Sequence, residues 1–454
     1  MTHRFDPVVL REYDVRGVVG RSLGPADARA LGRSFATRVR RAGGTRVVVG
    51  YDGRLSSPAL EAALVEGLTA GGVDVVRTGL GPTPQLYYAE AELEVDAGVQ
   101  VTGSHNPTDY NGFKMVLGHA AFFGEDIQDL ARLAAAGDWT EGSGTVTTAD
   151  VAEDYVQRLV RDVEGAGYRI GWDPGNGAAG PAIERLVQLL PGEHHVINAE
   201  VDGTFPNHHP DPTVEANLDQ LKRLVSERRL DFGVAFDGDG DRLGAIDGDG
   251  RVIWGDQLLA LLAAPVLARH PGATIIGDVK SSAMLFDRIA ELGGRPVMGK
   301  SGHSLIRTAM YEANAPLAGE LSGHIFFGDR WYGFDDAQYA AVRLIEAIAA
   351  SGHSLTELRG AMPALCTSPE LRVPVDEARK FAIAAEIVAR LLADGATVNT
   401  TDGARVTTPD GWWLLRASNT EAVVTVRAEA QDEAALDRLL AAIDDQLARS
   451  GVRW

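Results

Sequence analysis

The sequence places Asp237, Asp239 and Asp241 alternately with glycines, directly after an apolar run. Glycine lets a backbone curl tightly, so the three carboxylates can converge on one hard cation. An EF-hand loop also alternates aspartates, but its twelfth position is a glutamate, and counting from Asp237 that position is Gly248. The adjacent Arg242 favours Mg²⁺ that serves a phosphate group. A metal-free acidic turn is the weaker interpretation, because three like charges this close repel one another.

A serine and a lysine are the next candidates. Residues 102–107 read Thr-Gly-Ser-His-Asn-Pro. This loop is expected to expose Ser104 on a constrained backbone, as a nucleophile or a phosphate carrier requires. Serine, asparagine and proline also form ordinary turns, so a plain turn is the alternative. Lys114 follows ten residues later and is one of only five lysines among the 43 basic residues. An ammonium can lose its proton where a guanidinium cannot, although Lys114 could also be a solvated surface amine. Two other lysines, Lys222 and Lys380, lie in predicted helices and are expected on the surface.

Two neighbouring segments carry polar groups that fit a sugar phosphate. Glu320, Ser322 and His324 occupy alternate positions and would project to one side of an extended segment. Such a row fits sugar hydroxyls, but a polar loop without a ligand has the same composition. Lys300 and His303 precede a predicted helix, whose N-terminus would favour an anion.

A turn near the C-terminus could bind a phosphate. It begins with Arg416, between two predicted strands. Hydroxyl and amide donors follow at Ser418, Asn419 and Thr420. Arginine with such donors can form an anion-binding nest. The alternative is a hairpin turn with an incidental arginine.

These loops follow a repeated pattern of elements. Residues 46–76, 168–198 and 273–298 each read as strand, helix and strand, which predicts βαβ units with parallel strand pairs. The first strand of each unit ends at an aspartate: Asp52, Asp173 and Asp278. Three domains of one design would explain this, but aspartate and glycine also cap helices generally. After Cys366 the pattern changes to that of a small α+β domain. We expect an α/β fold with three similar mixed-sheet domains and a smaller α+β C-terminal domain around a central cleft. The expected boundaries are 1–150, 151–252, 253–366 and 367–454.

Composition limits the class of protein. The chain has 454 residues, a formal net charge of −20, 45% hydrophobic residues and a single cysteine, Cys366. The apolar content excludes wholesale disorder, and the acidic excess argues against a general nucleic-acid surface. One cysteine cannot form an intrachain disulfide, the first residues show no secretory signal, and the longest apolar run, of 11 residues, is too short to span a bilayer. We therefore expect a cytoplasmic protein with no nucleic-acid or membrane partner.

The order and spacing of these motifs resemble the α-D-phosphohexomutase superfamily, specifically its bacterial phosphomannomutase/phosphoglucomutase branch, over essentially the whole chain. The matching segments are residues 13–17 (Tyr-Asp-Val-Arg-Gly), 102–107, 110–115, 237–242, 300–306, 319–324 and 416–421.

The resemblance implies a role for each candidate residue. Ser104 would carry a phosphate, and the three aspartates would hold Mg²⁺ together with a phosphoserine oxygen. Lys114 would be a general acid or base, Arg16 would stabilise the transferring phosphoryl group, and His303 could carry a second proton. The residues expected to bind the substrate are Tyr13, Arg242, Lys280, Lys300, Glu320, Ser322, His324, Arg416, Ser418, Asn419 and Thr420.

The resemblance also implies an activity. The expected enzyme interconverts hexose 1-phosphate and hexose 6-phosphate, of mannose, glucose or both. The expected route passes through phospho-Ser104 and a hexose 1,6-bisphosphate, which is both intermediate and activator. Two alternatives remain: a phosphoglucosamine mutase, and a serine-dependent sugar phosphatase that releases phosphate to water.

Overall fold

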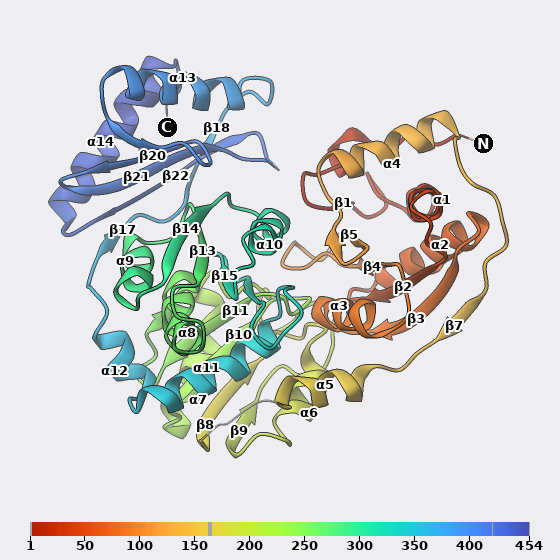
Figure 1. Cartoon of the computed structure of the whole chain (residues 1–454), viewed down its shortest axis with the longest axis horizontal. Coiled ribbons are helices and arrows are strands. Elements are labelled where there is room, and N and C mark those ends of the chain that lie inside the picture. Colours follow the sequence, from red (N-terminus) through yellow and green to blue (C-terminus); the bar gives the residue numbers. More distant parts are fainter. Residues whose placement is uncertain (1, 162–165, 420, 454) are drawn as a thin grey trace.

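Within residues 2–161, 166–419 and 421–453, which the computed structural model describes, the strands form four sheets in chain order. Figure 1 shows them in an arc, from the first sheet at the right of the view to the last, in blue, at the upper left. We call the four units the first, second, third and C-terminal domains.

The first and second domains are mixed sheets with helices. The first sheet has the order β1 (Val15–Val18), β5 (Tyr110–Leu117), β4 (Ala97–Val101), β2 (Arg46–Tyr51), β3 (Asp74–Leu80) and β7 (Val146–Thr148), with β6 (Ala120–Ala121) beside β5. Its helices are α1 (Pro25–Arg41), α2 (Ser57–Ala70), α3 (Thr83–Glu92) and α4 (Glu125–Ala136), after a short 3₁₀ helix at Pro7–Val9. The second sheet has the order β12 (Val252–Ile253), β11 (Leu243–Asp247), β10 (Phe232–Phe236), β8 (Tyr168–Asp173) and β9 (Gly192–Val196). Its helices are α5 (Ala152–Val160), α6 (Gly180–Leu186) and α7 (Asp219–Arg228), with a 3₁₀ helix at Glu215–Leu218.

The third and C-terminal domains complete the chain. The third sheet has the order β14 (Arg295–Gly299), β13 (Thr274–Asp278), β15 (Leu317–Gly319) and β16 (Ile325–Phe327). Its helices are α8 (Gly255–Arg269), α9 (Ala283–Glu291), α10 (His303–Glu312), α11 (Ala337–Ser351) and α12 (Leu355–Gly360). The last sheet has the order β17 (Cys366–Thr367), β22 (Val423–Ala430), β21 (Gly411–Ala417), β20 (Ala404–Thr408) and β19 (Thr397–Asn399), with β18 (Leu371–Pro374) beside β22. Its helices are α13 (Lys380–Ala393) and α14 (Glu433–Arg449).

The three predicted βαβ units are confirmed. Strands β2 and β3 pair in parallel across α2, β8 and β9 across α6, and β13 and β14 across α9. Each of these three sheets also contains an antiparallel pair, such as β4 with β5, β10 with β11 or β15 with β16, so the three are mixed as expected. Every residue of β10 is buried, as expected for a strand covered on both faces. Parallel strands of one sheet end at the same edge. The loops after β2 and β4 therefore share an edge of the first sheet, and the loops after β8 and β10 share an edge of the second.

The cores show which units are fused. The first and C-terminal domains each have a hydrophobic core of their own. The second and third domains share one continuous core, which also takes in side chains of α3, such as Tyr88. The C-terminal domain packs on the third through a small cluster of Val279, Trp412 and Leu414. In that contact the Arg405 guanidinium lies 3.6 Å from the centroid of the Trp412 ring. Among the described residues, the C-terminal domain therefore keeps its own core and joins the third domain through a small apolar contact.

The expectation that Lys380 lies on the surface is wrong. This lysine begins α13 and is only 2% exposed. Its ammonium donates to the carbonyl of Glu421 at 3.1 Å and pairs with Glu377 at 2.7 Å. Helical periodicity identified the helix but could not show that the loop after β21 covers its first turn. Lys222 pairs with Glu215 at 2.6 Å and stays partly exposed.

In the part of the chain that the structure describes, none of the helices combines the length and the apolar composition needed to cross a membrane.

Candidate active site

The loop after β4 holds Ser104 in an unusual conformation. Its φ is +47°, in the left-handed region that costs a non-glycine residue about 1–2 kcal/mol. Its amide donates to the Thr102 hydroxyl at 2.8 Å, and its own Oγ donates to Oδ2 of Asp237 at 2.6 Å. The serine is 2% exposed. A strained, buried hydroxyl on a carboxylate is a prepared site, not a solvent-facing turn.

Arg54 holds this loop through hydrogen bonds to its backbone. This residue was not singled out from the sequence. Its guanidinium donates to the carbonyls of Ser104, Asn106, Pro107 and Tyr110 at 2.5–2.9 Å. The side chain is buried and leaves no room at Gly103, where a β-carbon would lie 2.3 Å from Nε of Arg54. The available signal was its position two residues after the strand-end Asp52, in the first of the three repeated units.

The aspartate loop lies against the serine loop. A β-carbon at Gly238 would lie 2.5 Å from the carbonyl oxygen of Ser104, so only glycine allows this approach. Asp237, Asp239 and Asp241 are fully buried, and one oxygen of each lies within 4.8 Å of the others. Oδ1 of Asp239 and Oδ1 of Asp241 are buried and accept no hydrogen bond from the described residues. Clustered carboxylate oxygens that lack donors are what a hard divalent cation requires, so these residues fit Mg²⁺.

Lys114 extends from β5 into this cluster. Its ammonium donates to Oδ2 of Asp239 at 2.8 Å and also binds Asp241. Burial alone would lower the pKa of Lys114, but the two carboxylates outweigh it and raise that pKa well above its ordinary value. The same pairing holds the pKa of Asp239 well below its usual range despite burial. Burial and the neighbouring carboxylates raise the pKa of Asp237. Lys114 therefore keeps its proton and stays an ammonium in this arrangement.

Arg16 reaches the serine loop from β1, because β1 pairs with β5 beside it. Its guanidinium donates to the carbonyl of Gly103 at 3.0 Å and also binds Asn106 and Asp14. The structure thus brings together around Ser104 the residues that the sequence analysis grouped by resemblance: Arg16, Lys114, Asp237, Asp239 and Asp241.

The segment 320–324 is a turn, so of the two interpretations the polar loop holds and the extended polar row does not form. The amide of Glu320 donates to the carbonyl of His324 at 2.9 Å, which closes the antiparallel pair β15 and β16. A carboxylate oxygen of Glu320 instead accepts from the amide of Gly302 at 2.7 Å, at the start of α10. Alternation along one segment could not reveal this, because the pairing of β15 with β16 imposes the turn. Ser322 is partly exposed and Lys300 is exposed.

His324 links the aspartate loop to the third domain. Its Nδ1 lies 2.7 Å from Asp335, and its Nε2 accepts from Nε of Arg242 at 3.0 Å. Its Nδ1 also lies 3.6 Å from Asp241. Asp335 is a further residue that sequence reasoning missed, since its partner is visible only after folding. The ring of His303 stacks on His324 with centroids 5.4 Å apart. Burial, together with the nearby cations, lowers the pKa of His303 well below its ordinary value, so its imidazole is neutral.

Tyr13 joins three domains at the other end of the site. Its hydroxyl donates to the carbonyl of Ser301 at 2.8 Å and accepts from Nδ2 of Asn419 at 2.5 Å. Nε of Arg416 donates to Asp402 at 2.8 Å, and that carboxylate accepts from the amide of Ser301. The last phosphate-loop candidates therefore face the helix start at α10.

Three sequence candidates stand apart from these contacts or cannot be placed. Lys280 pairs with Glu370 at 3.4 Å at the edge of the C-terminal domain. Ser418 accepts from the amide of Glu421 at 3.2 Å. Thr420 lies outside the described residues.

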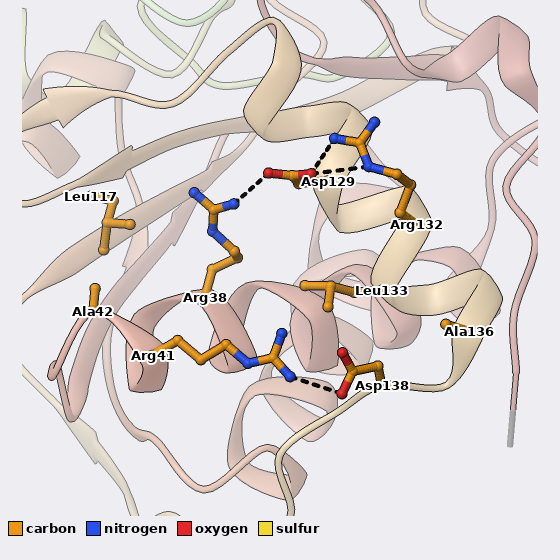
Figure 2. A pocket seen from close by; sticks show the side chains of 9 residues that line it. All are labelled: Arg38, Arg41, Ala42, Leu117, Asp129, Arg132, Leu133, Ala136 and Asp138. Atoms are coloured by element: carbon orange, nitrogen blue, oxygen red, sulfur yellow. Dashed lines mark hydrogen bonds and ion pairs between the residues drawn. The ribbon is translucent and has the colours of Figure 1, made fainter.

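A separate pocket of about 570 Å³ opens in the first domain (Figure 2). Its arginines come from α1 and α4, but each is paired: Arg38 and Arg132 with Asp129, and Arg41 with Asp138. Two carboxylates outside the lining also pair with these cations, Asp126 with Arg38 and Glu125 with Arg132. The pocket therefore offers little attraction to an anionic ligand.

Comparisons with known proteins match each of the four domains. Family models described as phosphoglucomutase/phosphomannomutase match the chain in order: alpha/beta/alpha domain I at residues 8–140, domain II at 153–250, domain III at 254–365 and the C-terminal domain at 370–446. The chain is 43% identical over 442 residues to a phosphomannomutase/phosphoglucomutase of Pseudomonas putida, covering 97% of this chain and 96% of the relative. It is 41% identical to a phosphoglucomutase of Neisseria meningitidis serogroup A, covering 95% of each chain. A solved structure of a phosphoglucomutase/phosphomannomutase family protein from Burkholderia thailandensis superposes with a TM-score of 0.93 at 44% identity, covering 99% of each chain.

Proposed function

The chain belongs to the phosphoglucomutase/phosphomannomutase family, in the α-D-phosphohexomutase superfamily, and on that premise we propose how its residues divide the work. It is a hexose-phosphate mutase, an isomerase that transfers a phosphoryl group. We propose that Ser104 carries that group. The observation that supports this most directly is the 2.6 Å contact between its Oγ and Asp237, beside two buried carboxylate oxygens that lack donors.

Asp237, Asp239 and Asp241 would hold Mg²⁺, with an oxygen of phosphorylated Ser104 as a further ligand. When bound, the ion would act as a Lewis acid on the phosphoryl group and neutralise its charge.

The chain's own side chains would supply the remaining charge and the protons. In the first transfer the bond between phosphorus and Oγ of Ser104 breaks, and a bond forms to the free hydroxyl of a hexose phosphate. Arg16, held on the serine loop, would stabilise the transferring group. The neutral imidazole of His303 would accept the hydroxyl proton, and the ammonium of Lys114 would donate one to the departing Oγ. The product is a hexose 1,6-bisphosphate, which must turn over in the cleft before its other phosphate returns to Ser104.

A second group of residues would bind the part of the substrate that does not react. Arg416, Ser418 and Asn419, with Tyr13 and with Thr420, would hold the other phosphate. The sugar hydroxyls would be read by residues of the third domain and its rim: Lys280, Lys300, Glu320, Ser322 and His324, together with Arg242. Mannose and glucose phosphates are the proposed substrates. We propose that the four domains span residues 1–150, 151–252, 253–366 and 367–454. The single cysteine supports a reducing, cytoplasmic location.

Replacing Ser104 tests the proposal. Ser104→Ala is expected to abolish interconversion of glucose 1-phosphate and mannose 1-phosphate with their 6-phosphates, and to remove covalently bound phosphate detected by intact mass spectrometry. Ser226→Ala, on the exposed face of α7, is the matched control and should keep both. Free phosphate is measured in the same reactions, because its stoichiometric release would indicate a phosphatase. Near wild-type turnover by Ser104→Ala would refute the proposed route.

A further inference from the structure

A segment of the second domain without helix or strand lies against the serine loop of the first. We call residues 200–210, between β9 and the 3₁₀ helix at Glu215–Leu218, the strap. The strap is anchored to its own domain by Asn176, whose side chain donates to the carbonyl of Glu200 and whose carbonyl accepts from the amide of Asp202. His208 adds a contact of 2.9 Å to Asp173, at the end of β8. It is therefore a fixed part of the second domain.

The strap packs on the segment that carries Arg54. A β-carbon at Gly203 would lie 2.6 Å from the carbonyl oxygen of Gly53 and 2.8 Å from Cα of Arg54, so the two backbones are in direct contact. The Phe205 ring lies under the Arg54 guanidinium, 5.3 Å from centroid to Cζ, and its own φ is +49°. A left-handed phenylalanine is unfavourable unless its surroundings hold it, and here Arg54 does so.

His209 makes the contact that reaches the serine loop. Its Nε2 lies 2.5 Å from the carbonyl oxygen of His105, the residue after Ser104. A carbonyl only accepts hydrogen bonds, so Nε2 carries a proton and donates it. Arg54 binds the carbonyls of residues 104, 106 and 107, and Arg16 binds that of residue 103. The His105 carbonyl completes this run, and His209 of the second domain is its donor.

We propose that His209 is a positioning residue that holds the serine loop in a fixed position relative to the aspartate loop. Ser104 belongs to the first domain and Asp237 to the second. Their 2.6 Å contact forms only if the two loops keep the same relative position. His209 ties the peptide after Ser104 to the domain that carries Asp237. Without this donor, the partly buried carbonyl of His105, next to the strained Ser104, loses its partner, and the peptide is free to rotate. The inference rests on the proposed role of Ser104.

Three substitutions separate the hydrogen bond from the bulk of the side chain. His209→Gln places an amide nitrogen near the original Nε2 and should keep kcat within about threefold of wild type. His209→Phe fills the space without a donor, and His209→Asn keeps a polar amide that falls short of His105. Both should lower kcat by about ten- to hundredfold, the scale of a displacement of about 1 Å at a reacting group. KM for glucose 1-phosphate should stay unchanged, because the proposed phosphate-binding residues lie elsewhere.

Two further readouts distinguish positioning from general damage. Hydrogen exchange of the peptide covering residues 103–107 should accelerate in His209→Phe and His209→Asn but not in His209→Gln. Thermal unfolding is measured for all three, and His353→Phe, at an exposed histidine between α11 and α12, is the control. Equal kcat in all variants, or an equal fall in His209→Gln and His209→Phe, overturns the inference. A rise in KM at constant kcat also overturns it. Ser104→Ala is measured alongside: if it retains turnover, the proposed function fails, whereas the exchange of residues 103–107 still judges the contact of His209.

Discussion

Asp336 should make the stability of this protein fall as the pH rises. The carboxylate precedes α11, accepts from the amide of Tyr339 at 2.8 Å and from the Tyr155 hydroxyl at 2.9 Å, and is 1% exposed. Burial, with the charge of Asp335, raises the pKa of Asp336 from 3.8 to about 7 in spite of these donors. Between pH 4 and pH 7 the native state thus holds a proton that the unfolded chain has released. The contribution of Asp336 to the free energy of unfolding therefore falls through this window and is constant above it.

The size of this effect follows from the pKa. One proton corresponds to about 1.4 kcal/mol per pH unit, so a shift of about three units amounts to about 4 kcal/mol at pH 8. Asp336→Asn keeps a side chain that caps helices well but removes the titration. The variant is expected to gain stability relative to wild type as the pH rises from 5 to 8, with most of the gain complete by pH 7.

Urea unfolding at pH 5, 6, 7 and 8, followed by tryptophan fluorescence, measures this difference. Trp331 stacks on Tyr339 at 4.1 Å and so reports on the start of α11. Hydrogen exchange of Ala337–Ser351 gives the same comparison locally. Asp444→Asn, at an exposed position of α14, is the control and should run parallel to wild type. If the curves of Asp336→Asn and wild type also run parallel from pH 5 to pH 8, the assignment of a buried, protonated Asp336 is refuted.

Three further outcomes follow from the contacts. Arg54→Met removes the donor of four carbonyls of the serine loop and should lower kcat at least tenfold, with a loss of about 2–4 kcal/mol of stability by urea unfolding. Wild-type values for both would contradict the role of Arg54 as the support of the serine loop. Lys380→Met removes the donor to the carbonyl of Glu421, beside the proposed phosphate-binding residues. It should raise KM for glucose 1-phosphate about tenfold with little change in kcat, whereas Lys222→Met should leave KM unchanged. An unchanged KM in Lys380→Met counts against a link between α13 and substrate binding. Adding Mg²⁺ at about 100 times its Kd to protein first treated with a chelator should stabilise that protein by about 2.7 kcal/mol. Asp239→Asn should remove this gain. Equal stabilisation of the variant would exclude the aspartate loop as the metal site.

Local patterns were enough to identify the fold class and the loops. The three βαβ units follow from short β-branched runs alternating with amphipathic helices, and their parallel pairs are confirmed. The aspartate loop is contiguous, so its three carboxylates and its glycines could be recognised in five residues. The order of the motifs also identified the family and the mutase activity, both of which the comparisons support.

Contacts between distant residues decided the rest. Ser104 meets Asp237 across 133 positions, and the carbonyl of His105 meets His209 across 104. Asp335 gave no signal of its own, and Arg54 gave only its position after Asp52, because an arginine or an aspartate in a loop has the same local appearance whether or not it holds a site together. The sequence left the segment at Glu320 open between a polar loop and an extended row, because the pairing of β15 with β16 determines its shape.

The lysines show the same division. The sequence by itself determined that lysine is scarce and that Lys114 follows the serine loop on an apolar run. Only the tertiary structure decided that Lys114 pairs with Asp239, and that Lys380 is buried while Lys300 is exposed. The physical reason is that periodicity shows which face of an element avoids water, whereas the partner of a charge depends on which other element the packing of the domains brings against it.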